Sequence, residues 1–235
     1  AAKLYERGAS TGQVMAFLIA SPWNSLSLTF ILIALVGLGW TLAFIAFSMV
    51  IAVISGVIFE MLTKRGTLPA NPNKVDLPEN FQILPEAKKS LKNAQFTPTF
   101  FKNMLWDGLK ESRMVLRWIL LGLVLAALVR AFMPPDQFET LFGPTLLGLG
   151  LTLGVATILE VCSEGTVPVA ADLLTRAGAP GNSFTFLMAG VATDYTEVMV
   201  LRDATKTWLI PLFLPLVTLP QILIVGWVMN IVSGG

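Results

Sequence analysis

The chain contains no histidine and only one cysteine among its 235 residues. Without histidine it lacks the commonest general base, the commonest zinc ligand and the usual titrating group near neutral pH. A single cysteine permits neither an internal disulfide nor a metal site built from several thiolates. Any protonatable site must therefore rely on carboxylates, the thiol or lysine.

Charge is also scarce. Charged residues make up 13% of the chain and hydrophobic residues 54%, with a mean hydropathy of +0.72, whereas soluble domains carry about 25% charged residues. We therefore expect an integral membrane protein in contact with lipid. The net charge of +1 argues against a nucleic-acid partner, which needs a concentrated basic face.

Motifs for the common membrane and soluble enzymes are missing as well. The sequence has no phosphate-binding P-loop, nucleophile elbow or HExxH motif, so ATP-driven transport within this chain and most hydrolytic chemistry are unsupported. A lone cysteine without histidine also lacks a plausible base. We predict that the protein is not an enzyme and needs no cofactor.

Long apolar runs predict membrane helices, since a span needs about 20 mostly apolar residues. These runs cover residues 26–58, 114–133, 146–159 and 209–232. The first is too long for one span, and we expect it to break near Gly37, Gly39 and Trp40. The break leaves a full span over residues 40–62.

Shorter helical pieces lie between these runs, at residues 13–21, 167–176 and 183–192. They are too short to cross a membrane alone. The predicted breaks fall at Pro22, Pro168, Gly178, Pro180 and Gly181. Irregular backbone at membrane depth is tolerated where protein buries it or where it lines a wet cavity, so we expect discontinuous or re-entrant helices. Interfacial turns between ordinary spans are the alternative.

One polar stretch, which starts at residue 63, interrupts the apolar sequence. Ten of the sixteen basic residues lie between residues 64 and 117, nine of them between the two spans and the tenth, Arg117, at the start of the second. By the positive-inside rule, loop 63–110 is cytoplasmic. Residues 101–117 place apolar side chains on one side of a helix and basic side chains on the other, which predicts an amphipathic helix at the lipid surface. We assign residues 63–106 to a cytoplasmic loop that includes the start of this helix.

The chain repeats itself. Residues 1–24 return as residues 170–194 with eight identical pairs. The pairs are Ala1/Ala170, Ala2/Ala171, Leu4/Leu173, Arg7/Arg176, Gly12/Gly181, Phe17/Phe186, Leu18/Leu187 and Ala20/Ala189. A duplicated, Gly/Pro-interrupted apolar segment is typical of transporters built from repeats. We therefore divide the membrane part into a first repeat, 1–62, and a second repeat, 107–235.

The two repeats are expected to have opposite orientations. Residues 40–62 must run inward to reach the cytoplasmic loop, whereas their counterpart 209–232 runs outward. The predicted fold is an all-α integral membrane protein of two inverted repeats, with discontinuous or re-entrant helices and a cytoplasmic linker. The second copy is preceded by residues 107–169, which have no counterpart before Ala1. We therefore expect a missing N-terminal portion, or a homo-oligomer that completes the site.

Two clusters could carry chemistry. The turn 159–168 places Glu160, Cys162 and Glu164 beside an apolar run. Ionisable residues at membrane depth cost about 2.5–3.5 kcal/mol each and tend to be functional. The thiolate and carboxylates could hold a thiophilic metal or metalloid, or the carboxylates could relay protons. Alternatively, the turn lies in the headgroup zone, where these residues cost little.

The second cluster is formed by Thr193, Asp194 and Glu197. Asp194 and Glu197 can share a helix face and bind a cation or couple protons, while Thr193 could cap the helix that follows. The corresponding part of the first copy carries the uncharged residues Ser21, Pro22 and Asn24. One half would thus supply acidic groups, and the other neutral hydrogen-bonding groups and a helix break.

Two motifs make the chain similar to a known family. The turn with Cys162, Gly165 and Pro168, and the RGA-x-x-G-x-x-x-AFL-x-A-x-P pattern that contains Gly12, Phe17, Ser21 and Pro22, resemble the predicted permease family (YraQ-like) to which the organoarsenical efflux permeases (ArsP) belong. The resemblance implies an inner-membrane permease with two related halves flanking a cytoplasmic loop. Glu164 stands where that turn often has a second cysteine, which argues against a thiol-pair site and an arsenical substrate.

Together these features predict a secondary permease that exports a small solute or metal(loid) species. Coupling to ions or protons would run through Glu160, Glu164, Asp194 and Glu197, while the direction of transport and the substrate class rest on the resemblance alone. Two other functions stay open. The chain could be an uncoupled pore whose carboxylates attract cations, or a non-transporting membrane subunit of a larger complex.

Overall fold

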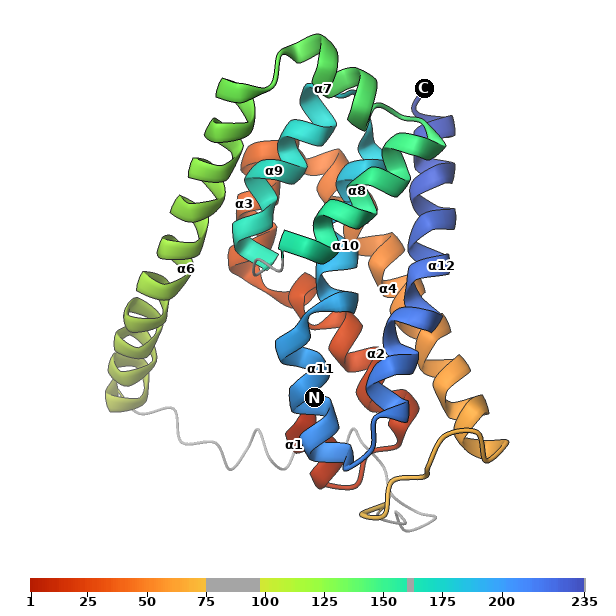
Figure 1. The fold of residues 1–235 in the computed structure, drawn as a ribbon. Helices are drawn as coiled ribbons and strands as arrows, with labels where there is room; N and C mark the ends of the chain where they lie inside the picture. Colours follow the sequence, from red (N-terminus) through yellow and green to blue (C-terminus); the bar gives the residue numbers. More distant parts are fainter. Residues whose placement is uncertain (75–97, 160–162, 235) are drawn as a thin grey trace.

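Apolar helices account for the regular structure of the chain. A computed structural model describes residues 1–74, 98–159 and 163–234, and these ranges contain helices and connections but no strand (Figure 1). The elements are α1 (Ala2–Glu6), α2 (Thr11–Ala20), the 3-10 helix η1 (Pro22–Asn24), α3 (Leu26–Val36), α4 (Leu38–Lys64), α6 (Pro98–Phe132), α7 (Pro135–Phe142), α8 (Leu146–Leu159), α9 (Ser163–Thr175), α10 (Pro180–Thr193), α11 (Tyr195–Thr205) and α12 (Leu209–Val232).

Within the described residues, three stretches of helix are long and apolar enough to cross a membrane. They are α4, the α10–α11 pair at Pro180–Thr205, and α12, and a fourth candidate is the pair Ile119–Phe132 and Pro135–Phe142, bent by 110°. Large apolar side chains such as Val53, Leu216 and Ile224 are more than 60% exposed on these helices, as expected where a helix faces lipid rather than water. The protein is a multi-pass membrane protein.

Glycine and proline have different effects on the helices. Gly37 separates α3 from α4 with a φ of 86°, a left-handed conformation that glycine adopts without steric cost, and this confirms the predicted break. The predicted break at Pro168 is wrong, because α9 continues through it. Proline removes one helical hydrogen bond, but Pro168 is buried in a helix that packs against α3, α6 and α10, and this packing offsets the loss.

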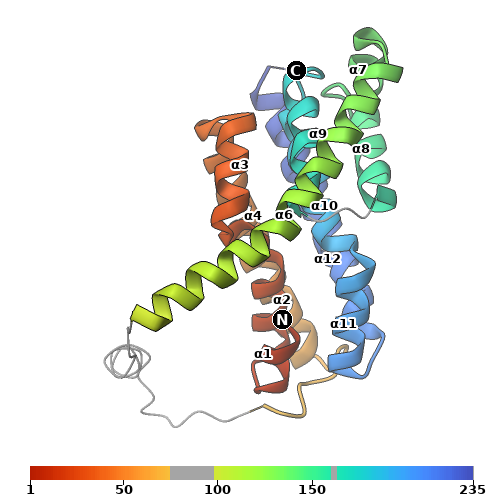
Figure 2. The same ribbon diagram turned by 90° about the vertical axis from the view of Figure 1, so that its left-hand side faces the viewer.

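α6 joins two predicted segments in one helix. It runs without a break across residues 106 and 107, where the sequence analysis separates the loop from the second repeat, and it contains both the amphipathic segment and the following apolar run. Its main contact is with α9, and Figure 2 shows its first half diverging from the bundle. The two helices approach at Gly122, where a Cβ atom would overlap the carbonyl oxygen of Gly165.

Two helix pairs are built in the same way. α2 packs against α4 with Gly12 facing Gly56, and α10 packs against α12 with Gly181 facing Gly226. A side chain at Gly12 or Gly181 would overlap the backbone of the opposite helix, so both pairs depend on direct backbone contact. Figures 1 and 2 show α4 and α12 running in opposite directions, with the C-terminus at the end of the bundle away from α1.

An aromatic cluster joins the N-terminal and C-terminal parts of the bundle. Phe44 from α4 and Trp23 from η1 lie 5.7 and 6.3 Å from Phe184 of α10, measured between ring centroids. The Trp23 indole Nε1–H also donates to the sulfur of Met188 over 3.0 Å. All four side chains are buried, so this contact packs η1 and α4 against α10.

A chain of buried amides closes the start of α10. Asn230 of α12 accepts a hydrogen bond from the Gly181 amide over 2.7 Å and donates to Asn182 over 2.8 Å. Asn182 then donates to the carbonyls of Phe142 and Gly143 over 2.8 and 3.0 Å. Since a buried amide without partners is costly, this network fixes the position of α12 and the α7–α8 connection relative to α10.

Candidate functional site

Two helix breaks meet at a small cavity inside the bundle. α2 ends at Ala20 and is followed by Ser21 and Pro22, while α10 ends at Thr193 and α11 begins after Asp194. Both breaks lie within the height of the bundle rather than at its ends (Figure 1). The cavity between them has a volume of about 50 Å³. It receives side chains from segments that are far apart in the sequence.

Local chemistry explains the break on the α2 side. Pro22 has no backbone N–H and begins the 3-10 helix η1, a position that proline tolerates well. The Ser21 hydroxyl donates to the carbonyl of Leu18 over 3.1 Å, which satisfies an acceptor at the end of α2. The break thus places a hydroxyl and the end of a half-helix at the cavity.

The break on the other side is an N-cap. The Asp194 Oδ1 atom accepts hydrogen bonds from the amides of Thr196 and Glu197 over 2.7 and 3.4 Å, and from the Thr196 hydroxyl over 2.5 Å. The predicted cap at Thr193 is wrong, since its hydroxyl donates backward to Ala189 over 2.8 Å. Asp194 is the N-cap of α11 in place of Thr193. Its carboxylate is a stronger acceptor than the Thr193 hydroxyl and complements the positive end of the α11 dipole.

The cavity combines acidic, hydroxyl and apolar groups. Its lining residues are Leu18, Ser21, Pro22, Thr166, Leu187, Gly190, Val191, Asp194 and Glu197. A water molecule needs about 10–15 Å³ of such space, so there is room for a few waters or for one small ion with part of its hydration shell. Carboxylate and hydroxyl oxygens suit a proton or a hard cation.

The structure brings together four of the residues that the sequence singled out. Ser21 and Pro22 reach the cavity from the first copy of the repeated segment, and Asp194 and Glu197 reach it from the second. The two carboxylates are three residues apart at the start of α11 and lie on one side of that helix, as the spacing predicts. Their roles remain predictions.

Four other predicted site residues do not line the cavity. Asn24 is exposed, and neither it nor Thr193 lines the cavity. Gly165 and Pro168 are buried in α9 outside the lining, and Gly165 makes the close contact with α6.

The predicted metal ligands cannot be placed. Glu160 and Cys162 lie outside the described residues, and Glu164 belongs to α9 without a described side chain. Among the side chains that are described, no three acidic or thiol groups could hold a metal ion together. The predicted metal(loid) site at this turn therefore stays a prediction.

Sequence reasoning did not assign five of the lining positions to the site, namely Leu18, Thr166, Leu187, Gly190 and Val191. Thr166 lies within the turn singled out for its acidic residues, but it is neutral and drew no attention. Gly190 follows Leu187 by three residues and precedes Asp194 by four, which places all three on one side of the helical path. That periodicity, extended from Asp194 back into α10, could have identified the face that lines the cavity.

A cluster of ion pairs around a buried carboxylate was also missed. The carboxylate of Asp172 in α9 is 1% exposed and pairs with the Arg130 guanidinium of α6, whose Nε lies 3.0 Å from both carboxylate oxygens. Arg176 lies 3.8 Å from the same carboxylate, stacks over Phe138 of α7 and donates to the Met133 carbonyl over 3.4 Å. This cluster ties α6 and α7 to α9 away from the cavity.

These features define a multi-pass membrane protein with broken helices that meet at a polar cavity. The family described as ArsP_1, a predicted permease, matches residues 1–231. The chain therefore belongs to this permease family, which confirms the resemblance found in the sequence and indicates a membrane transporter rather than an enzyme. No curated protein and no solved structure matches the chain.

Proposed function

We propose that the protein is a secondary permease that exports a small solute or metal(loid) species in exchange for protons or another ion. The observation that carries the proposal is the cavity in which Ser21 and Pro22 meet Asp194 and Glu197. Transporters commonly bind substrate and coupling ions where discontinuous helices from two repeats meet near the middle of the membrane.

The proposal includes two inverted repeats. The sequence identities between residues 1–24 and 170–194 support it, and so do the glycine contacts of the two helix pairs, Gly12 with Gly56 and Gly181 with Gly226. The opposite directions of α4 and α12 agree with inversion (Figure 1). Rocking of one repeat against the other would open the cavity alternately to each side. We place the protein in the inner membrane with loop 63–110 in the cytoplasm.

Asp194 and Glu197 are the proposed coupling groups. Ionisable residues within a membrane helix are costly and tend to serve a pathway or relay. Within the described part of the chain, the hydrogen bonds to Asp194 use only Oδ1, so Oδ2 can bind a proton or cation. Glu160 and Glu164 remain part of the proposed pathway, and Thr166 lines the cavity four residues after Cys162.

The test measures coupled flux in everted membrane vesicles. A pH-sensitive dye reports proton movement after addition of arsenite, methylarsenite or divalent cations, with Asp194→Asn and Glu197→Gln compared against the wild type. Asp203→Asn is the matched control, because this carboxylate is exposed and pairs with Arg202 over 2.9 Å outside the cavity. We expect the two cavity variants to lose substrate-dependent proton movement and the control to keep it.

Other outcomes would contradict coupling. Wild-type flux and pH dependence in both cavity variants would remove Asp194 and Glu197 from the mechanism. Flux that persists without proton movement, with altered cation selectivity only, would indicate an uncoupled pore. If membranes with the wild-type protein and membranes without it gave equal flux across the panel, a non-transporting membrane subunit would become the better explanation.

A further inference from the structure

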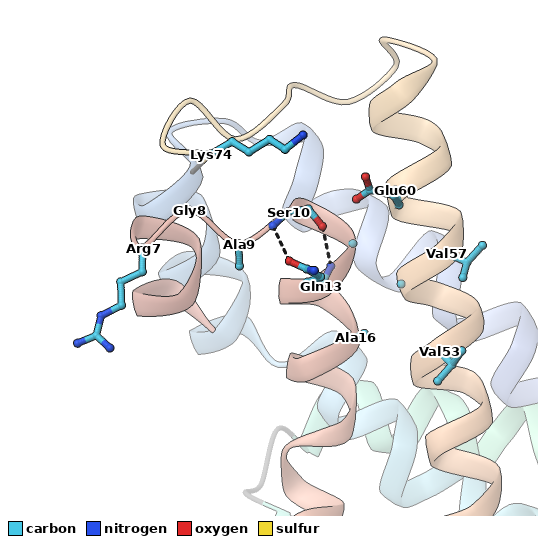
Figure 3. Close-up of a pocket in the computed structure, with 12 residues that line it drawn as sticks. Arg7, Gly8, Ala9, Ser10, Gln13, Ala16, Val53, Val57, Glu60 and Lys74 are labelled. Carbon is cyan, nitrogen blue, oxygen red and sulfur yellow. Dashed lines mark hydrogen bonds between the residues drawn. The ribbon is translucent and has the colours of Figure 1, made fainter. Parts of the chain in front are cut away.

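A second, larger cavity lies between α2 and α4. Its volume is about 780 Å³, and its floor is formed by Gly12, Ala16, Val53, Gly56 and Val57. The polar lining residues are Arg7, Ser10, Gln13, Glu60 and Lys74 (Figure 3). We call this space the α2–α4 groove. Its floor is apolar, and Val53 and Val57 are 63% and 56% exposed.

The corresponding groove in the C-terminal part of the chain is filled by a helix. α8 packs against α10 and α12. Its Leu149 side chain would lie 3.1 Å from a Cβ atom at Gly226, and a Cβ atom at Gly148 would lie 3.2 Å from the Asn182 Nδ2 atom. The carbonyls of Phe142 and Gly143, which precede α8, accept the hydrogen bonds of Asn182. An apolar, glycine-rich helix with its preceding loop therefore closes this groove.

The two grooves correspond at three residue pairs. The repeat aligns Gln13 with Asn182, and the glycine contacts align Gly56 with Gly226. Four residues after these glycines, Glu60 on α4 corresponds to Asn230 on α12. The residues that touch α8 or its loop in one half thus have counterparts that line the open groove in the other.

One buried oxygen at the polar end of the open groove has no hydrogen-bond partner among the described residues, although Glu60 Oε1 lies 4.0 Å from Lys64 Nζ and Gln13 Oε1 accepts from the Ser10 amide over 3.0 Å. Asn230 uses its side chain in hydrogen bonds to Gly181 and Asn182. At the corresponding position, the Glu60 Oε2 atom is buried and has no hydrogen-bond partner among the described residues. Figure 3 shows Glu60 pointing from α4 toward the start of α2. A buried carboxylate oxygen of this kind needs a donor from another segment.

We propose that the α2–α4 groove binds an apolar, glycine-containing helix equivalent to α8. This helix would belong to the part of the natural chain that leads into α1. Chain order favours this occupant. The identities Ala1/Ala170, Leu4/Leu173 and Arg7/Arg176 align α1 with the end of α9, and α8 immediately precedes α9 along the chain. The inference rests on the two-repeat part of the proposed function, but it does not depend on Asp194 or Glu197.

The experiment is photo-cross-linking of the full natural chain in its own membrane. Benzoylphenylalanine is placed at Val53 in the groove and, as a matched control, at Ile54. Ile54 is also exposed, at 45%, but points about 100° away around the helix and does not line the groove. A second probe at Val57 tests the same groove from another position, in case the probe at Val53 disturbs the local fold.

We expect the Val53 and Val57 probes to form a cross-link within one polypeptide, which peptide mass spectrometry maps to residues before Ala1. The Ile54 probe should not form it. A product of twice the chain mass would assign the groove to a second copy and overturn the inference, as would cross-links to lipid alone. Because the measurement needs no transport, failure here and failure of the flux test are distinguishable.

Discussion

The contact between Gly181 and Gly226 gives the sharpest stability prediction. A Cβ atom at position 181 would overlap the Gly226 carbonyl oxygen and lie 2.6 Å from the Asn230 Oδ1 atom. Gly181→Ala must therefore push α12 away from α10 and weaken the 2.7 Å hydrogen bond between the Gly181 amide and Asn230. The substitution should destabilise the protein although alanine is the better helix former.

The magnitude follows from three contributions. Overpacking of a tight contact costs about 1–3 kcal/mol, and a lost hydrogen bond about 0.5–1.5 kcal/mol. The higher helix propensity of alanine relative to glycine offsets at most about 1 kcal/mol of this cost. We expect a net loss of about 0.5–3.5 kcal/mol, which corresponds to a fall in Tm of roughly 1–14 °C for a chain of this size.

Thermal unfolding of the purified protein in detergent, followed by tryptophan fluorescence, measures this loss. Gly154→Ala in α8 is the control, because nothing lies within 4 Å of a Cβ atom at that helical position. That variant should keep or slightly raise the Tm, since only the propensity term acts. If both variants shift the Tm equally, or Gly181→Ala has no effect, α10 and α12 do not meet by backbone contact.

Three further predictions concern buried polar groups and orientation. Asn230→Ala should lower the free energy of unfolding by about 2–4 kcal/mol, because buried amides lose their partners. A loss below about 0.5 kcal/mol, the scale of a surface change, would contradict the network. Asp172→Asn should cost about 1–3 kcal/mol, because the carboxylate is buried while its partner Arg130 is 60% exposed. Asp203→Asn should cost less than about 1 kcal/mol, and equal losses would contradict the burial of the Asp172 carboxylate. In a cysteine-free background, Thr67→Cys and Ser233→Cys should react with an impermeant maleimide from opposite sides of the membrane; labelling from one side would contradict the inverted orientation.

Local sequence signals predicted much of the helical layout. The bounds of α8 and α12 agree with the predicted runs 146–159 and 209–232, and the α3–α4 break falls at Gly37. These features depend on apolar length and on one residue with special backbone freedom, which sequence alone reveals. The passage of α9 through Pro168 could not be predicted, because its stability comes from packing against distant helices.

The same limit applies to the candidate site. Repeat comparison identified Ser21 and Asp194, since both mark helix breaks at related positions. By contrast, the ion pair of Asp172 with Arg130 joins residues 42 positions apart, and no local pattern connects them. Thr166 was missed because a neutral hydroxyl in an acidic turn has no distinctive spacing, although it reaches the cavity from a third helix.

Side-specific accessibility of Ser21 tests the proposed alternating pathway most directly. Ser21→Cys, in a background without other cysteines, is exposed to an impermeant maleimide from either face of oriented vesicles under opposite proton gradients. The account predicts labelling from one face at a time, with the reactive face switching when the gradient is reversed. Simultaneous labelling from both faces would indicate an open pore, and labelling from neither face would contradict a transport role for the cavity.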